Sequence, residues 1–365
     1  MRVGVPREIK NHEYRVGLTP PSVVELVAAG HEVIVEHGAG DGIDFSDEAY
    51  VRSGARIVPT AAEVFAQSDL IVKVKEPQPH EIALLEPRHV LFTYLHLAAD
   101  RPQAEGLMRS GSTCIAYETV TSSTGALPLL KPMSEVAGRM AIQVGAHYLE
   151  KEQGGRGILL GGVPGVRPAR VAILGGGVAG LNAAQIAVGQ RADVTIYDIS
   201  NDRLAELDTF FGSQIKTVYA SKAAIAAAVA NAHLVIGAVL VPGAAAPKLV
   251  TRDMLKTMKR GSVIVDIAID QGGCFETSRP TTHDDPVFEV DGVIHYCVAN
   301  MPGAVARTST FALNNATLPF VLRIAGKGAE QAMEDDPHLA RGLNVSGGKI
   351  RHPAVAAALD LPYER

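Results

Sequence analysis

The chain has 365 residues, of which 47% are hydrophobic and 20% are charged, and its formal net charge is −5. This composition is typical of an ordinary globular protein, and the length favours two domains. The lack of a long basic run argues against nucleic acid or an anionic membrane as the main partner. No stretch is apolar enough for a membrane helix or a signal peptide, and the three scattered cysteines form neither a metal-ligand pattern nor a disulfide framework, which favours a reducing, cytoplasmic setting.

The first part of the chain alternates strand-like and helix-like segments. A strand at 2–6 precedes a helix at 19–30, where Thr19 suits the N-cap and Gly30 suits the end, and a strand follows at 31–36. Alternation of this kind predicts a mainly parallel sheet with helices on both faces. Further strand and helix pairs are predicted at 55–68, 69–86 and 89–111, with a last strand at 112–118.

A long helix is predicted at 128–155, capped by Ser134 or the residues just before it and ended by a pair of glycines. A second alternating run then begins at the strand 170–174. A helix from about residue 305 leaves this run, and the tail beyond it is predicted to be helical and polar. This order indicates a discontinuous first domain, formed by residues 1–129 and 303–365, with residues 130–302 inserted in it.

A glycine-rich turn follows the strand 170–174. Gly175, Gly177 and Gly180 have the spacing G-x-G-x-x-G, which permits a tight turn, close approach of the backbone to a pyrophosphate, and close packing of the next helix. Asp198 ends the next strand, where an acidic side chain binds the ribose hydroxyls and disfavours a 2′-phosphate. We therefore predict an α/β protein with two doubly wound parallel-sheet domains: a Rossmann-type NAD domain inserted into a flavodoxin-like substrate domain and joined to it by long helices.

Polar side chains stand at the ends of four predicted strands. They are Arg15, Lys75, His96 and Asp270, with Lys73 competing with Lys75 on the same strand. Ligands of doubly wound sheets lie outside the carboxyl ends of the strands, so these side chains are expected to share one cleft. Two cations suit a small carboxylate, and histidine exchanges protons near neutral pH. The set predicts hydride transfer on a 2-amino or 2-hydroxy acid, and position alone does not choose between them.

Longer stretches of the chain resemble the L-alanine dehydrogenase family. They include "LFTYLHLAA", "DIAIDQGGCFE" and "HYCVANMPGAV", and the resemblance covers almost the whole chain, weakening after about residue 325. It implies reversible, NAD-dependent oxidative deamination of L-alanine to pyruvate and ammonium by a homohexamer.

The resemblance also implies residue roles. Arg15 and Lys75 match the substrate binders of the family, and His96 and Asp270 match its acid/base pair. Ala220 stands where relatives often have a serine that contacts the adenine, and Ser221 is a candidate to replace it. Together with the glycines of the turn and with Arg203, which replaces a common lysine, the predicted cofactor contacts are Ser134, Gly175, Gly177, Val178, Ala179, Gly180, Asp198, Arg203, Val239, Leu240, Ile267, Ala268, Ile269, Asp270, Arg279, Val298, Ala299, Asn300 and Met301.

Two other dehydrogenase-like functions remain as alternatives. A transhydrogenase-type NAD-binding subunit would carry an Arg-Gln-Asp loop where this chain has "KPMSEVAGRMA", and a saccharopine-type dehydrogenase is disfavoured by "VKVKEP" and "LFTYLHLAA". A non-catalytic NAD sensor would have no use for the four polar residues. No metal site is predicted, because Glu118 has no partner at ligand spacing. The division of proton transfers between His96 and Asp270, the direction of the reaction, activity on serine or glyoxylate, and the binding of a divalent ion stay open.

Overall fold

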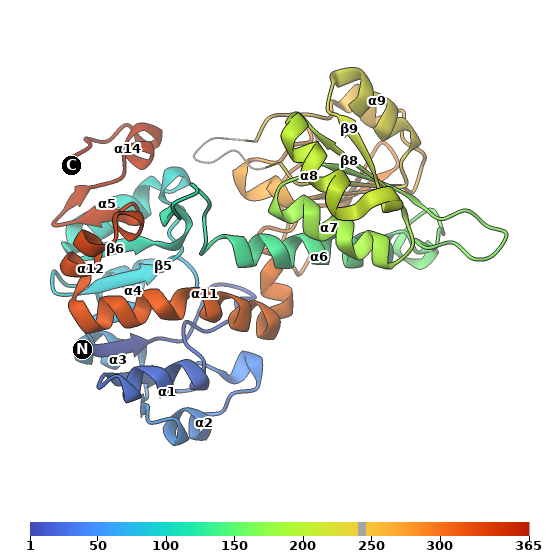
Figure 1. The fold of residues 1–365 in the computed structure, drawn as a ribbon. Coiled ribbons are helices and arrows are strands. Elements are labelled where there is room, and N and C mark those ends of the chain that lie inside the picture. Colours follow the sequence, from blue (N-terminus) through green and yellow to red (C-terminus); the bar gives the residue numbers. More distant parts are fainter. Residues whose placement is uncertain (240–245, 365) are drawn as a thin grey trace. The chain divides into compact units, whose positions relative to one another are not determined.

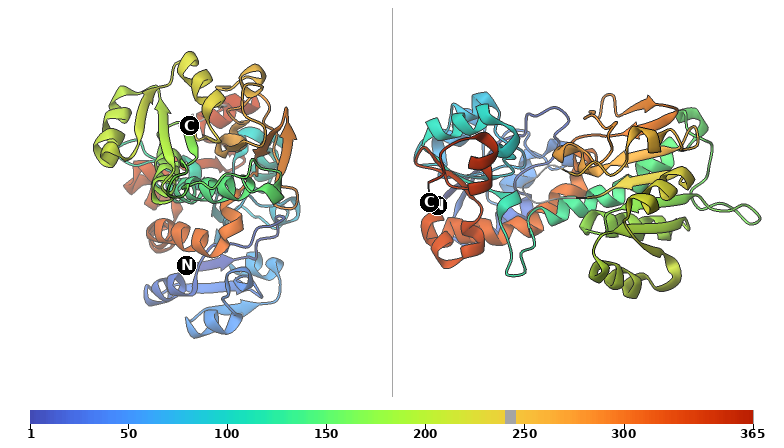
Figure 2. Two further views of the ribbon diagram at one scale, coloured as in Figure 1. Left: turned by 90° about the vertical axis from the view of Figure 1, so that its right-hand side faces the viewer. Right: turned by 90° about the horizontal axis from the view of Figure 1, so that it is seen from above.

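The computed structural model describes residues 1–239 and 246–364. The chain forms two compact units, whose segments can be followed by colour in Figures 1 and 2. Unit 1 comprises Met1–Met133 and Val305–Arg365, and unit 2 comprises Ser134–Ala304. The two segments of unit 1 therefore come from opposite ends of the sequence.

Both borders between the units lie at long helices. The first falls within α6 (Lys131–Tyr148), and the second lies directly before α11 (Ala306–Lys327). From the sequence we expected the borders at 129/130 and 302/303. Ser134 or a preceding residue was also expected to cap the first long helix, but α6 begins at Lys131, so Ser134 lies inside its first turn.

Unit 1 is built on an eight-stranded sheet with the order β15-β14-β6-β5-β4-β1-β2-β3. β1 to β6 run parallel, whereas β14 lies antiparallel to β6 and β15 lies antiparallel to β14. The order changes direction between β1 and β4, which makes this pair the switch point of the sheet. The strands are β1 (Arg2–Val5), β2 (Glu32–Glu36), β3 (Arg56–Val58), β4 (Leu70–Val72), β5 (Val90–Thr93), β6 (Thr113–Ala116), β14 (Leu343–Ser346) and β15 (Lys349–Ile350).

The central strands of unit 1 are covered on both faces. All three residues of β4 are fully buried, which explains why its sequence is a continuous apolar run rather than an alternating one. The helix α11 packs against α1 (Figure 1). The other helices of this unit are α1 (Pro20–Ala28), α2 (Asp47–Arg52), α3 (Ala61–Gln67), α4 (Pro79–Ile82), α5 (Arg101–Ser110), α12 (Ala329–Asp335), α13 (Pro337–Ala340) and α14 (Pro353–Leu359).

The tail of the chain is not wholly helical, which corrects the prediction. β14 and β15 form a hairpin whose turn contains Gly347 and Gly348, with φ angles of 58° and 78°. Glycine adopts such positive φ angles without the steric cost that other residues carry, and Gly-Gly is a favoured hairpin turn. β14 pairs with β6 and so covers an edge that the six parallel strands would leave open.

Unit 2 is built on a seven-stranded sheet with the order β12-β13-β11-β10-β7-β8-β9. All neighbours are parallel except β12, which lies antiparallel at the edge. The strands are β7 (Arg170–Leu174), β8 (Asp193–Asp198), β9 (Lys216–Tyr219), β10 (Leu234–Gly237), β11 (Val263–Asp266), β12 (Val287–Val290) and β13 (Val293–Tyr296), and the helices besides α6 are α7 (Val178–Gly189), α8 (Asn201–Phe211), α9 (Lys222–Asn231) and α10 (Arg252–Leu255).

The predicted α/β class with two parallel-dominated sheets is confirmed. In both units the first five parallel strands lie in the order third, second, first, fourth, fifth, which is the Rossmann arrangement. The description of the first domain as flavodoxin-like is therefore corrected, because that arrangement places the third strand beside the first. Among the described residues, no helix is long and apolar enough to cross a membrane.

Candidate active site

Three of the predicted site residues follow neighbouring strands of unit 1. Arg15 lies in the loop after β1, Lys75 lies three residues after the end of β4, and His96 lies three residues after the end of β5. β1 and β4 are the pair at the switch point, and β5 is the next strand. The crevice outside the carboxyl ends of such strands is where open α/β sheets bind ligands. The strands end earlier than predicted, so Lys75 and His96 belong to loops rather than to strands.

The structure distinguishes Lys75 from Lys73. Lys73 is fully buried, and its Nζ lies 3.2 Å from Glu8 Oε2 and 2.8 Å from Glu81 Oε1. Burial by itself would lower the pKa of Lys73, but the two carboxylates outweigh it and the pKa is raised. The Lys75 side chain is 12% exposed, with its Nζ 3.6 Å from Glu76 Oε2. Lys75 is therefore the lysine of this pair that a small molecule can reach.

Arg15 is a buried cation and not a surface one. Its residue is 2% exposed, and its Nε and Nη2 each donate to a different oxygen of Glu13 at 2.6 Å. Nη1 lies 3.0 Å from the sulfur of Met133. Burial opposes the charged form, yet the Glu13 carboxylate keeps the pKa of Arg15 above its usual value. A substrate carboxylate bound at two points would have to use the Nη1–Nη2 edge, because Glu13 occupies the other one.

His96 is exposed between two buried leucines. Its φ of 50° is left-handed, a conformation that costs a non-glycine residue about 1–3 kcal/mol. The Glu118 carboxylate holds it there, since Oε1 accepts the backbone N–H of His96 at 2.6 Å and that of Leu95 at 3.2 Å. The imidazole stacks on Tyr94, with ring centroids 5.7 Å apart and planes inclined by 8°. The sequence suggested Glu118 only as an unpartnered metal ligand, and its actual contacts were missed.

The glycine-rich turn of unit 2 has the geometry that a dinucleotide requires. Gly175 has a φ of 102°, and a Cβ on Gly180 would lie 1.9 Å from the Gly175 carbonyl oxygen. A Cβ on Gly177 would meet nothing within 4 Å, so space is open beside the N-cap residue of α7. In the part of the chain that the structure describes, no side chain caps this helix, and its first turn carries no acidic residue. Its N-terminal N–H groups are therefore suited to bind an anion. The residues present fit a pyrophosphate group.

Asp198 and Arg203 bind the same turn from the other side. Asp198 Oδ2 accepts the backbone N–H of Gly176 at 2.7 Å, and Oδ1 accepts that of Ser200 at 2.9 Å. Arg203 Nε donates to the Gly176 carbonyl at 2.6 Å. Ser221, the candidate replacement at the adenine end, caps α9 by accepting the Ala224 N–H at 3.1 Å.

The remaining predicted cofactor residues follow other strand ends of unit 2. Val239 follows β10, residues 267–270 follow β11 in the short 3-10 helix η6 (Ile267–Gln271), and residues 298–301 follow β13. Arg279 lies over the Phe288 ring, with its Cζ 4.1 Å from the centroid. Leu240 lies outside the described residues. The loops after β7, β8, β10, β11 and β13 therefore all lie at the carboxyl ends of the parallel strands of this sheet.

Asp270 is exposed and lies beyond the strand that was expected to carry it. β11 ends at Asp266, a fully buried carboxylate that binds both ends of the following turn. Its Oδ1 accepts the Ala268 N–H at 3.1 Å, and its Oδ2 accepts the Cys274 N–H at 3.0 Å and the Ser278 hydroxyl at 2.5 Å. Burial raises the pKa of Asp266 despite these bonds. Asp266 therefore fixes the turn that presents Asp270.

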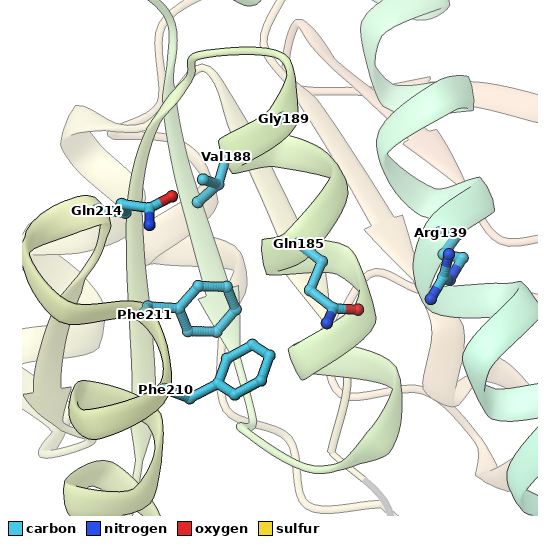
Figure 3. Close-up of a pocket in the computed structure, with 7 residues that line it drawn as sticks. All are labelled: Arg139, Gln185, Val188, Gly189, Phe210, Phe211 and Gln214. Atoms are coloured by element: carbon cyan, nitrogen blue, oxygen red, sulfur yellow. The ribbon is translucent and has the colours of Figure 1, made fainter.

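Two hollows on unit 2 lie away from these strand ends. In the first, of about 480 Å³, Phe210 and Phe211 reach toward Gln185, with Arg139 beyond it (Figure 3). The second, of about 530 Å³, is lined by residues of α6 and of the loop after it. Neither contains a predicted site residue. Among the described residues, no three His, Cys, Asp or Glu side chains are placed to hold a metal ion.

Comparison with known proteins identifies the family. The model described as "Alanine dehydrogenase/PNT, N-terminal domain" matches residues 4–137, and the corresponding C-terminal domain matches residues 141–353. The chain belongs to the alanine dehydrogenase/PNT family. A family member named alanine dehydrogenase from Halomonas elongata is 60% identical over 363 residues, which cover 100% of this chain and 98% of that protein.

Solved structures of the family agree with this assignment. A structure titled L-alanine dehydrogenase is 55% identical, with a TM-score of 0.95 and coverage of 99% of both chains. A transhydrogenase from Sinorhizobium meliloti is 27% identical, with a TM-score of 0.82 and coverage of 97% of this chain and 100% of that one. The predicted family is confirmed, and within it this chain is more similar to the alanine dehydrogenases than to that transhydrogenase.

Proposed function

We propose that this chain is an NAD-dependent L-alanine dehydrogenase, which interconverts L-alanine and water with pyruvate and ammonium. The observation that carries the proposal is the position of Arg15 and Lys75 at the switch point of the unit 1 sheet, with an exposed His96 in the loop after the next strand. High identity over the full length to proteins named alanine dehydrogenase supports the choice of substrate. By the same resemblance, the proposal extends to a cytoplasmic homohexamer.

Unit 2 is proposed to bind the cofactor. The backbone of the turn at Gly175–Gly177 and the N-terminus of α7 would hold the pyrophosphate, and Asp198 would accept hydrogen bonds from the adenosine ribose. Its carboxylate has lone pairs to spare beside the two backbone N–H groups it already accepts. The Ser221 hydroxyl accepts one N–H as a cap and keeps its own proton to donate to the adenine. NAD, when bound, supplies the acceptor for the hydride of the substrate Cα.

Unit 1 is proposed to bind the amino acid. The Arg15 guanidinium, fixed by Glu13, would pair with the substrate carboxylate, and the Lys75 ammonium would bind the carbonyl oxygen of pyruvate. Binding both ends of the substrate orients its Cα hydrogen. Positioning of this kind lowers the activation barrier by several kcal/mol, on the order of the effects measured for oriented reactants.

Proton transfers are proposed for His96 and Asp270. Alanine loses the Cα hydride to NAD and a proton from its ammonium group, which leaves iminopyruvate. Water then adds to Cα and gives one proton to one of these two side chains, which forms the carbinolamine. That side chain returns the proton to the carbinolamine nitrogen, ammonia departs, and the hydroxyl proton is lost as the carbonyl of pyruvate forms. Both side chains are exposed, His96 in a loop and Asp270 in the short 3-10 helix η6, so each is accessible to solvent between turnovers.

The substrate assignment is tested by mixing the purified protein with NAD and a panel of L-amino acids and following NADH formation. L-Alanine is expected to give the fastest turnover. Absence of turnover with L-alanine, or a strong preference for lysine or a 2-hydroxy acid, would overturn the proposal.

The role of His96 is tested by replacing it with alanine. His96→Ala is expected to lower kcat by about 10²–10⁴-fold while NADH binding stays nearly unchanged. His80→Ala is the matched control, because His80 is an exposed histidine of α4 in the same unit with no predicted role. Wild-type turnover by the His96→Ala enzyme would refute the proposed role of His96 in proton transfer.

A further inference from the structure

Glu8 is a buried carboxylate in the loop after β1, the loop that also carries Arg15. Its residue is 8% exposed. Oε1 accepts the backbone N–H of Val74 at 2.6 Å and that of Lys75 at 3.3 Å, and Oε2 accepts from Lys73 Nζ at 3.2 Å. One side chain from the loop after β1 therefore binds three consecutive residues of the segment that leaves β4.

The segment after β4 depends on Glu8 to accept from two of its N–H groups. β4 ends at Val72, and beyond it the Lys73 N–H donates to the Phe92 carbonyl at 3.2 Å, while the Val74 carbonyl accepts from the Tyr94 N–H at 3.3 Å. The Lys75 carbonyl accepts from the Thr93 hydroxyl at 2.9 Å. The N–H groups of Val74 and Lys75 both donate to Glu8. A buried N–H that loses its acceptor is strongly unfavourable, so the backbone would move to find another acceptor.

Lys73 is the cation paired with Glu8 in this buried setting. Burial raises the pKa of Glu8, and the Lys73 ammonium acts against that rise. Glu81, the second carboxylate on Lys73, differs from Glu8 in what else it binds. Its Oε2 accepts the N–H of Gln78 at 2.7 Å, which caps its own helix α4, and it contacts neither Val74 nor Lys75 through a hydrogen bond that the structure shows.

We propose that Glu8 is a positioning residue for substrate binding, which sets the place of the Lys75 ammonium by binding the backbone of Val74 and Lys75. Lys73 is the counter-ion that stabilises the Glu8 carboxylate in this buried position. Glu81 completes the neutralisation of Lys73 and takes no part in placing Lys75. The inference rests on the proposed function, because it assigns Lys75 the task of holding the substrate.

The test compares Glu8→Gln with Glu81→Gln, which each remove one carboxylate from Lys73. In Glu8→Gln an amide replaces the carboxylate that accepts from the N–H groups of Val74 and Lys75. A displacement of the Lys75 ammonium by about 1 Å would lower the rate on the order of 10²-fold. We expect kcat/KM for pyruvate to fall at least about tenfold, with a raised KM for pyruvate and an unchanged KM for NADH. Glu81→Gln is expected to lower the unfolding midpoint comparably but to keep KM for pyruvate within about twofold of wild type.

A merely structural role for Glu8 predicts a different outcome. In that case both variants lose stability and neither shifts KM for pyruvate, or both shift it alike, and either result overturns the proposal. If Glu8→Gln does not fold, Glu8→Asp keeps the charge on a shorter side chain that cannot reach both N–H groups, and the same KM shift is expected of it. Absence of pyruvate turnover by the wild-type enzyme would refute the proposed function instead, so the two failures are distinguishable.

Discussion

Asn314, in the middle of α11, joins the two sequence segments of unit 1. Its Oδ1 accepts the Thr19 N–H at 2.8 Å and the Ser22 hydroxyl at 2.9 Å, and its Nδ2 donates to the Gly17 carbonyl at 3.0 Å. The residue is 2% exposed. Thr19 is the N-cap of α1, and Gly17 follows Arg15 by two positions, so this amide fixes both the start of a helix and the loop of a proposed substrate binder.

The cost of Asn314→Ala follows from the groups it leaves behind. The N–H of Thr19 and the carbonyl of Gly17 would lose their partner inside the protein, and each such group costs about 1–3 kcal/mol. Alanine has a better helix propensity than asparagine by about 0.5 kcal/mol, which offsets a little of this loss. The expected decrease in the free energy of unfolding is about 2–5 kcal/mol.

Urea denaturation followed by far-UV circular dichroism measures this decrease, since the chain has no tryptophan to serve as a fluorescent probe. Asn315→Ala is the control, because Asn315 is the exposed next residue of the same helix and gains the same propensity. The control is expected to stay within about 0.5 kcal/mol of wild type. If the two variants unfold at the same urea concentration, the hydrogen bonds of Asn314 add no net stability and the reasoning is refuted.

Two further predictions concern unit 2. Gly180→Ala places a Cβ 1.9 Å from the Gly175 carbonyl, so NADH affinity in a fluorescence titration should fall more than about tenfold. Gly189→Ala is the control and should bind NADH as the wild type does, because its Cβ meets nothing within 4 Å. Equal affinities of the two variants would contradict the proposal that this turn binds the cofactor. Burial lowers the pKa of His295 to about 4. Between pH 6.5 and 4 this histidine is therefore protonated in the unfolded state but not in the folded one. The free energy of unfolding consequently falls as the pH decreases through this range, by up to ~3 kcal/mol. His295→Gln should flatten this slope in urea titrations at several pH values, and an unchanged slope would refute the assignment.

The sequence predicted the features that repeat or that stand close together along the chain. The alternation of strands and helices indicated two doubly wound sheets, and Gly175, Gly177 and Gly180 marked the turn of the second one. The hairpin of β14 and β15 was missed although Gly347 and Gly348 signal it, because the polar tail was interpreted as helical throughout.

The features that were missed depend on residues far apart in the chain. Glu8 and Lys75 are separated by 67 positions, and Glu118 and His96 by 22, so no local pattern shows that these carboxylates bind those backbones. The choice between Lys73 and Lys75 likewise needed the burial of the former against Glu8 and Glu81. Strand ends were predicted too late because apolar residues continue beyond the last ladder bond, as in the segment that leads to His96.

The interrupted layout of unit 1 bears on how the protein is made by the ribosome. Unit 2 is one uninterrupted stretch, Ser134–Ala304, and its sheet is complete once that stretch has emerged. At that moment the six parallel strands of unit 1 still lack α11 and the hairpin that covers the β6 edge. An open edge of this kind can pair with other chains, so nascent unit 1 needs protection until its final residues appear. The order of synthesis thus makes the N-terminal segment, Met1–Met133, although translated first, the last to finish folding.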